Sequence, residues 1–198
     1  MMTLTWNHEN ELASPQRNPG GVLVPQTEKG LTGKGFEFLA EMERMHMIVD
    51  VSHLSDKGFW DIVEHGTRPF AASHSNCRAL APHTRNLTDE MIRALSERGG
   101  IAGLNYYAPF LDTDPTHPEN CRSTVELIAK HAAHYKQVGG AQMIALGSDF
   151  DGIDGPHQLE NAAFLPLLAD ALRKEGFTED EVEGIYYRNA MRFFEENL

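Results

Sequence analysis

Histidine and aspartate side chains follow several short apolar runs of this 198-residue sequence, at the point where each run ends. His53 ends "IVDVSH", His74 follows "PFAAS", and Asp149 and Asp151 follow "MIALGS". Neutral imidazoles bind zinc at about 2.0–2.1 Å, so two histidines that meet can share one ion. A carboxylate beside them could be a further ligand or a general base acting on the metal's water. These residue types predict a metal site with acid–base chemistry, provided that the fold brings them together.

Simpler interpretations exist for the same residues. A lone histidine at the end of a strand is commonly bonded to backbone, and "SDFDG" at residues 148–152 could be a plain turn. Two such histidines in succession, each next to a serine, favour the ligand role. His131 and His134 also have helical spacing, but their helix is expected on the outside of the sheet, so we interpret them as surface or partly packed residues. We expect Cys77 to be a buried, inert thiol. The remaining loop and helix-end histidines are expected to be solvated, namely His46, His65, His83, His117 and His157.

Apolar runs and helix signals alternate along the chain. Strands are predicted within residues 2–6, 47–51, 69–72, 100–104 and 143–146. Thr32, Ser55 and Thr88 are predicted N-caps of amphipathic helices between the strands, and "TEDE" at 178–181 is a capping box. A fourth amphipathic stretch begins at Val125. Residues 11–30 and 112–119 are rich in proline and predict loops. Alternating strands and helices predict a parallel sheet covered by helices.

Composition narrows the functional class. The chain carries 17 basic and 29 acidic residues, a formal net charge of −12, which argues against a nucleic-acid partner. No apolar run approaches the roughly 20 residues of a membrane span. The start of the sequence lacks the pattern of a signal peptide. Its two cysteines, Cys77 and Cys121, form neither a metal-type cluster nor a disulfide framework. We therefore expect one domain over residues 1–198, cytoplasmic, with no membrane or nucleic-acid partner.

Two α/β architectures compete for this pattern, an open doubly wound sheet and a (β/α) barrel. No glycine-rich dinucleotide fingerprint follows a predicted strand, because "GLTGKG" at 30–35 follows a loop. Polar residues at the carboxyl ends of several strands are typical of a barrel mouth.

Three motifs, taken in order, decide between the two architectures. They are "GLTGKGFEFLAEMERMHMIVDVSHLS", "PFAASHSNCRALAPHTRNLTDEMI" and "ALGSDFDGI". Together they resemble the renal, or membrane, dipeptidase family of zinc metallopeptidases, whose fold is an amidohydrolase-like (β/α) barrel. The resemblance runs from about residue 3 to residue 194.

The resemblance implies roles for four residues. His53 and His74 match two ligands of a binuclear zinc centre and would sit mainly on one of its metals. Arg85, in "HTRN", matches the arginine that binds the dipeptide's C-terminal carboxylate, a task suited to a guanidinium fork. Asp149 matches the acid–base residue near the bridging water. The implied reaction is hydrolysis of a dipeptide's peptide bond by metal-activated water.

The sequence also departs from the family pattern. The family's first strand supplies a His-x-Asp ligand pair and a later strand a bridging glutamate, and neither is found ahead of "TLTW", which matches the fourth strand. Some members carry a histidine where this chain has Trp6. We therefore expect a partial TIM-type barrel of roughly strands four to eight, weaker metal binding, and association with another copy or a partner chain. Two alternatives stay open: a catalytically impaired fragment that acts only with a partner, and an amidohydrolase-type enzyme acting on cyclic amides or lactones.

Overall fold

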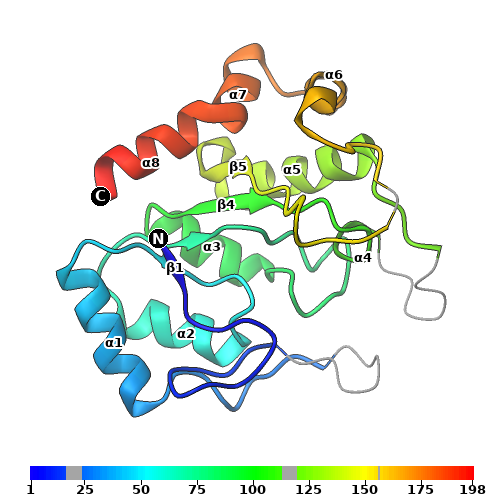
Figure 1. The fold of residues 1–198 in the computed structure, drawn as a ribbon. Helices are drawn as coiled ribbons and strands as arrows, with labels where there is room; N and C mark the ends of the chain where they lie inside the picture. Colours follow the sequence, from blue (N-terminus) through cyan, green and yellow to red (C-terminus); the bar gives the residue numbers. More distant parts are fainter. Residues whose placement is uncertain (17–23, 113–119, 156) are drawn as a thin grey trace.

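The computed structural model describes residues 1–16, 24–112, 120–155 and 157–198. Five short parallel strands form one sheet in the order of the sequence (Figure 1). They are β1 (Met2–Thr3), β2 (Val49–Asp50), β3 (Ala71–Ala72), β4 (Ile101–Leu104) and β5 (Ile144–Leu146). Each predicted apolar run contains one of them. A doubly wound sheet reverses its strand order at a switch point. Here every strand lies beside its predecessor, as in the wall of a barrel.

Hydroxyl side chains begin the helices where the sequence predicts. Thr32, Ser55 and Thr88 accept hydrogen bonds from the backbone N–H three residues later, and Thr178 forms the capping box with Glu181. Such a cap contributes about 1 kcal/mol to helix stability. The α-helices are α1 (Gly33–Arg44), α2 (Asp56–His65), α3 (Asp89–Glu97), α4 (Ala108–Leu111), α5 (Val125–Gly139), α6 (Leu165–Lys174), α7 (Glu179–Glu183) and α8 (Asn189–Asn197). A π-helical turn, Gly184–Arg188, joins α7 to α8.

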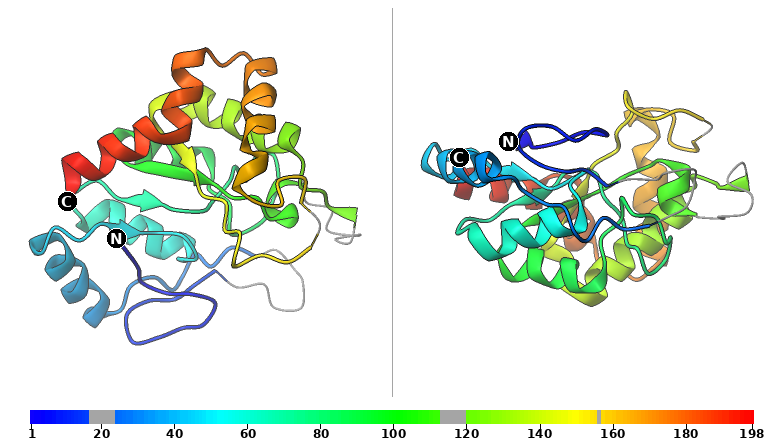
Figure 2. Two further views of the ribbon diagram at one scale, coloured as in Figure 1. Left: turned by 45° about the horizontal axis from the view of Figure 1, so that its top comes forward. Right: turned by 90° about the horizontal axis from the view of Figure 1, so that it is seen from below.

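The main core lies between one face of the sheet and a row of helices. Within this row α2 contacts α3, α3 contacts α5, and α5 contacts α6, so the helices follow one another around the sheet (Figure 2). Alternate side chains of the strands, among them Val49, Ala72, Ala102 and Ile144, join this core. The period of two places their neighbours on the opposite face.

The opposite face of the sheet has its own small apolar cluster. Ile48, Ala71, Ile101 and Ala145 pack there against Phe193 of α8. Ala71 and Ile101 begin β3 and β4, Ile48 directly precedes β2, and Ala145 is the second residue of β5. Helix α8 therefore covers the amino-terminal part of this inner face of the sheet. The carboxyl-terminal half is left to polar residues, and the site described below lies there.

The histidines outside the strand ends only partly follow expectation. His131 is 1% exposed, because α5 packs against helices on several sides as well as against the sheet. Its Nδ1 accepts the Cys77 N–H and its Nε2 donates to the Leu111 carbonyl, both at 3.1 Å. The interpretation of His131 as a surface or partly packed residue is therefore wrong. It holds for His134, which is half-buried with Nε2 2.7 Å from Asp89.

Other expectations from the sequence have mixed outcomes. His46 and His65 are exposed as expected, whereas His83 and His157 are half-buried. His117 lies outside the described residues, as do parts of both predicted loops. Cys77 is a buried free thiol, as predicted. Among the helices that the structure describes, none has the length and apolarity needed to cross a membrane.

We predict that Phe193→Ala destabilises the protein by about 3–5 kcal/mol, because it removes the aromatic ring that covers the inner-face cluster. Urea denaturation measures this free energy of unfolding. The matched control is Met191→Ala on the same helix, because Met191 is 53% exposed. This substitution should change the free energy of unfolding by less than about 0.5 kcal/mol. If Phe193→Ala changed the free energy of unfolding as little as Met191→Ala, α8 would not be part of the core.

Candidate metal and substrate site

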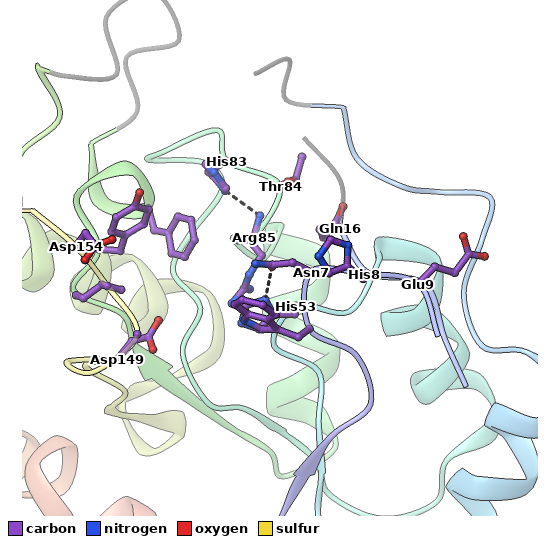
Figure 3. Close-up of a pocket in the computed structure, with 15 residues that line it drawn as sticks. Asn7, His8, Glu9, Gln16, His53, His83, Thr84, Arg85, Asp149 and Asp154 are labelled. Atoms are coloured by element: carbon purple, nitrogen blue, oxygen red, sulfur yellow. Dashed lines mark hydrogen bonds between the residues drawn. The ribbon is translucent and has the colours of Figure 1, made fainter. Parts of the chain in front are cut away.

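Three of the predicted site residues follow strand ends: His53 after β2, His74 after β3 and Asp149 after β5. The fourth, Arg85, lies in the loop after β3. His53, Arg85 and Asp149 line a cavity of about 700 Å³ (Figure 3). His74 contacts His53 beside this cavity, with the two Nε2 atoms 2.9 Å apart. The structure therefore brings together the four residues to which the family resemblance gives roles.

The two imidazoles are in the form that binds metal. Burial, and then the positive charge of Arg85, lower the pKa of His53 to about 2. The same two causes lower the pKa of His74, against the opposing charges of Asp50 and Asp149. A neutral imidazole keeps a lone pair on one ring nitrogen, which is the atom that binds zinc. Two such ligands at tetrahedral angles on one zinc would have nitrogens roughly 3.3 Å apart. The observed pair is close to this spacing, so its donor set fits a shared divalent cation.

A buried carboxylate lies behind His74. The Ser73 hydroxyl is 2.6 Å from His74 Nδ1 and donates to Asp50 Oδ2 at 2.5 Å. Asp50 is 2% exposed and also accepts from the Thr3 hydroxyl and from the N–H groups of Ser52 and Ser73. The sequence reasoning did not select Asp50. The signal for it is an acidic residue inside the otherwise apolar run "IVDV".

Arg85 is a buried cation with unused donors. It is 8% exposed, and its Nε and Nη2 have no hydrogen-bond partner among the residues that the structure describes. Burial lowers its pKa to about 10, with Asp50 and Asp149 acting against this shift, so the guanidinium stays charged at neutral pH. Buried charged donors that lack hydrogen-bond partners are unfavourable. The two free donors therefore favour an anionic ligand, and a carboxylate matches their fork.

A second arginine holds the loop that carries Arg85. Arg78 forms a bidentate ion pair with Asp56 at 2.7 and 2.8 Å. The same guanidinium donates to the backbone carbonyls of Thr84 and Asn86, both at 2.9 Å. Because these carbonyls flank Arg85 on either side, the ion pair fixes the direction from which Arg85 enters the cavity.

His83 is a cavity residue that the sequence reasoning placed in solvent. Its Nδ1 accepts the backbone N–H of Arg85 at 3.1 Å, and its ring centroid lies 4.5 Å from that of Phe110. Burial, and then the charges of Arg85 and Arg78, lower its pKa to about 4. The available signal was its position two residues before Arg85.

Backbone strain coincides with the site. His53 and Asp149 have φ values of 70° and 62°, in the left-handed region that non-glycine residues rarely adopt. Conformations of this kind cost on the order of 1 kcal/mol or more and concentrate at functional sites. The Asn105 side chain donates to Asp149 Oδ2 at 3.2 Å and so orients the carboxylate.

Two neighbours of these residues differ in exposure. Asp151, the second aspartate of "SDFDG", is exposed, whereas Tyr106, which follows Asn105, is fully buried.

Comparison with known proteins assigns the chain. The family model for membrane dipeptidases, peptidase family M19, matches residues 1–197. The chain belongs to this family. The assignment confirms the resemblance found in the sequence, and the solved structures of the family, which have a TIM-barrel-like fold, confirm the partial (β/α) barrel.

Several relatives extend the comparison. An uncharacterized protein in the pqqA 5′ region of Klebsiella pneumoniae is 37% identical over 189 residues, covering 94% of this chain and 68% of the relative. An uncharacterized dipeptidase of Schizosaccharomyces pombe is 33% identical over 193 residues, covering 96% of this chain and 45% of the relative. The chain thus spans about half the length of this dipeptidase.

Solved structures of related proteins show the same relation. A metallopeptidase of Rhodobacter sphaeroides, liganded with a phosphinate mimic of the dipeptide L-Ala-D-Ala, is 33% identical with a TM-score of 0.79. The match covers 85% of this chain and 48% of that protein. The probable dipeptidase PvdM of Pseudomonas aeruginosa has a TM-score of 0.86 at 17% identity, which shows the shared fold, with 98% and 61% of the two chains covered.

Proposed function

We propose that this chain acts in the zinc-dependent hydrolysis of dipeptides that carry a free C-terminal carboxylate. The observation that carries the proposal is a single cavity lined by His53, which contacts His74 beside the cavity, and by Arg85, two of whose donors have no partner among the described residues. This cavity offers a place for a metal and a place for a carboxylate. The Rhodobacter relative, which binds a dipeptide mimic, supports this substrate class.

His53 and His74 would hold the metal through their Nε2 atoms. When zinc is bound, it supplies Lewis-acid polarisation of a carbonyl and makes water more acidic. The family resemblance implies further ligands, a His-x-Asp pair and a bridging glutamate, that we do not find in this sequence. We propose that the chain forms a homo-oligomer. Support comes from β1 and β5, which are the two edges of the described sheet and so present unpaired backbone groups.

Asp149 and Arg85 divide the remaining work. Arg85 binds the carboxylate of the dipeptide and thereby orients the peptide bond in the cavity. Water adds its oxygen to the carbonyl carbon, and Asp149 accepts the proton that the water loses. Asp149 then gives this proton to the amine nitrogen as the C–N bond breaks. Asn105 keeps the carboxylate of Asp149 in one orientation for both transfers.

We propose a cytoplasmic location. Both cysteines of the chain are buried and free, which suits a reducing compartment.

Asp149→Asn should lower the turnover of an Ala–Ala dipeptide by about 10²–10⁴-fold, because an amide cannot accept and release the proton. Zinc content should stay unchanged. Asp151→Asn is the matched control, since that carboxylate is exposed two residues away. Unchanged turnover in the Asp149 variant would contradict the proposed role.

Arg85→Lys should raise KM for the dipeptide at least about tenfold, because one ammonium cannot replace two parallel donors. A C-terminally amidated dipeptide, which lacks the carboxylate, should show no such difference between the variant and the parent. Arg44→Lys, at an exposed position of α1, serves as the control. An unchanged KM in the Arg85 variant would instead favour the alternative substrates, cyclic amides or lactones.

Zinc content and molar mass, measured on one purified sample, should give bound zinc in an oligomer of this chain. Light scattering after size-exclusion chromatography gives the mass, and mass spectrometry of the metal gives the content. A monomer with only trace zinc would support the alternative of an impaired chain that depends on another partner.

A further inference from the structure

We propose that Asp50 and Ser73 fix the tautomer of His74, with the proton on Nδ1 and the lone pair on Nε2. This inference rests on the proposed function, in which Nε2 of His74 binds the metal. Asp50 and Ser73 are then positioning residues that prepare the ligand atom before any metal arrives.

The direction of these hydrogen bonds is set by Asp50. An ionised carboxylate can only accept hydrogen bonds. Oδ1 accepts the N–H groups of Ser52 and Ser73 at 3.0 and 2.9 Å, and Oδ2 accepts the hydroxyls of Thr3 and Ser73. The single hydroxyl hydrogen of Ser73 goes to Asp50 Oδ2 at 2.5 Å, because its other acceptor, the Ser52 hydroxyl, is 3.4 Å away. Ser73 Oγ can only accept from its other close neighbour, His74 Nδ1 at 2.6 Å, so Nδ1 carries a proton.

The same tautomer is favoured at His53. Its Nδ1 lies 3.1 Å from the side-chain oxygen of Asn7, which accepts (Figure 3). Both Nε2 atoms then present lone pairs to each other across 2.9 Å. Two lone pairs cannot form a hydrogen bond, and a shared cation satisfies both. The pair is thus prepared to bind a metal ion.

The backbone around Ser73 leaves little room for another arrangement. The Ser52 hydroxyl accepts the His74 N–H at 3.0 Å. A Cβ atom at Gly103 or Gly147 would clash with the Ser73 carbonyl oxygen, so β4 and the end of β5 press against this residue. Ser73 therefore holds its hydroxyl in one place between Asp50 and His74.

The decisive variant is Asp50→Asn, because it should reverse the order of donors. The two backbone N–H groups keep the amide oxygen at the Oδ1 position, so the NH₂ group takes the Oδ2 position and donates to Ser73. Ser73 then donates to His74 Nδ1, and the proton of His74 moves to Nε2. The ligand atom is lost although the shape of the site is kept, and we expect zinc affinity to fall about 10–100-fold.

The tautomer is measured on the metal-free, ¹⁵N-labelled protein by long-range ¹H–¹⁵N correlation of the imidazole rings. The parent should show His74 protonated on Nδ1, and Asp50→Asn should show it protonated on Nε2. An Nε2-protonated ring in the parent, or an unchanged ring in a folded Asp50→Asn variant, would overturn the proposal.

A second pair of variants covers the case in which Asp50→Asn does not fold. Ser73→Ala should abolish the preference for Nδ1 protonation, and Ser73→Thr should restore it by returning the hydroxyl. Ser96→Ala, whose hydroxyl bonds the Gly139 carbonyl, is the control and should leave the His74 signals unchanged. Equal tautomer populations in the alanine and threonine variants would contradict the proposed roles of Ser73 and Asp50.

Zinc affinity, measured by competition with a chelator, separates this inference from the proposed function. The expected tautomers together with weakened zinc binding in Ser73→Ala support both the tautomer proposal and the proposed function. The expected tautomers in a parent protein that binds no zinc would uphold the tautomer proposal and contradict the metal site.

Discussion

The buried carboxylate of Asp50 is the interaction on which the site depends. A carboxylate that is 2% exposed is stable only if several donors surround it. Asp50 takes these donors from three neighbouring strands or their ends: the Thr3 hydroxyl from β1, the Ser52 N–H after β2, and two groups of Ser73 after β3. Meeting this requirement fixes the relative positions of the strand ends. His53 and His74 are carried by the same strand ends, so their contact is a consequence of satisfying Asp50.

The division of the inner face explains how a polar site can exist beside so short a sheet. At the amino-terminal half, Phe193 closes the apolar layer of Ile48, Ala71, Ile101 and Ala145. Two residues beyond Ile48 and Ala71, the inward positions are Asp50 and Ser73, and Ser52 follows two residues after Asp50. The apolar layer at the amino-terminal half therefore supplies hydrophobic stabilisation. The polar layer at the carboxyl-terminal half can carry hydrogen bonds and charge. Because α8 covers this part of the sheet, the helix takes part in the core.

Sequence reasoning succeeded where local signals are strong. The five strands, the hydroxyl N-caps and the parallel arrangement follow from apolar runs and capping residues that act over a few positions. His53, His74 and Asp149 were found because polar residues interrupt these runs at strand ends, and Arg85 because its motif resembles that of the family. His131 was placed wrongly because the helical period reports one buried face, whereas α5 is packed on several. Asp50 and His83 were missed because their roles depend on partners in other elements, and no local pattern shows that a strand aspartate has collected four donors.

Burial and the charge of Arg85 together set the electrostatics of the site. Burial first, and then the charge of this guanidinium, lower the pKa values of His53, His74 and His83. These imidazoles therefore stay neutral. Asp50 and Asp149 act in the opposite sense on Arg85 and keep it charged despite its burial. The site thus combines neutral imidazoles with a fixed cation. A neutral Arg85 would remove the second cause that lowers the pKa of these histidines and leave burial as the main one. The same charge that would bind a substrate carboxylate therefore acts with burial to keep the two candidate metal ligands neutral.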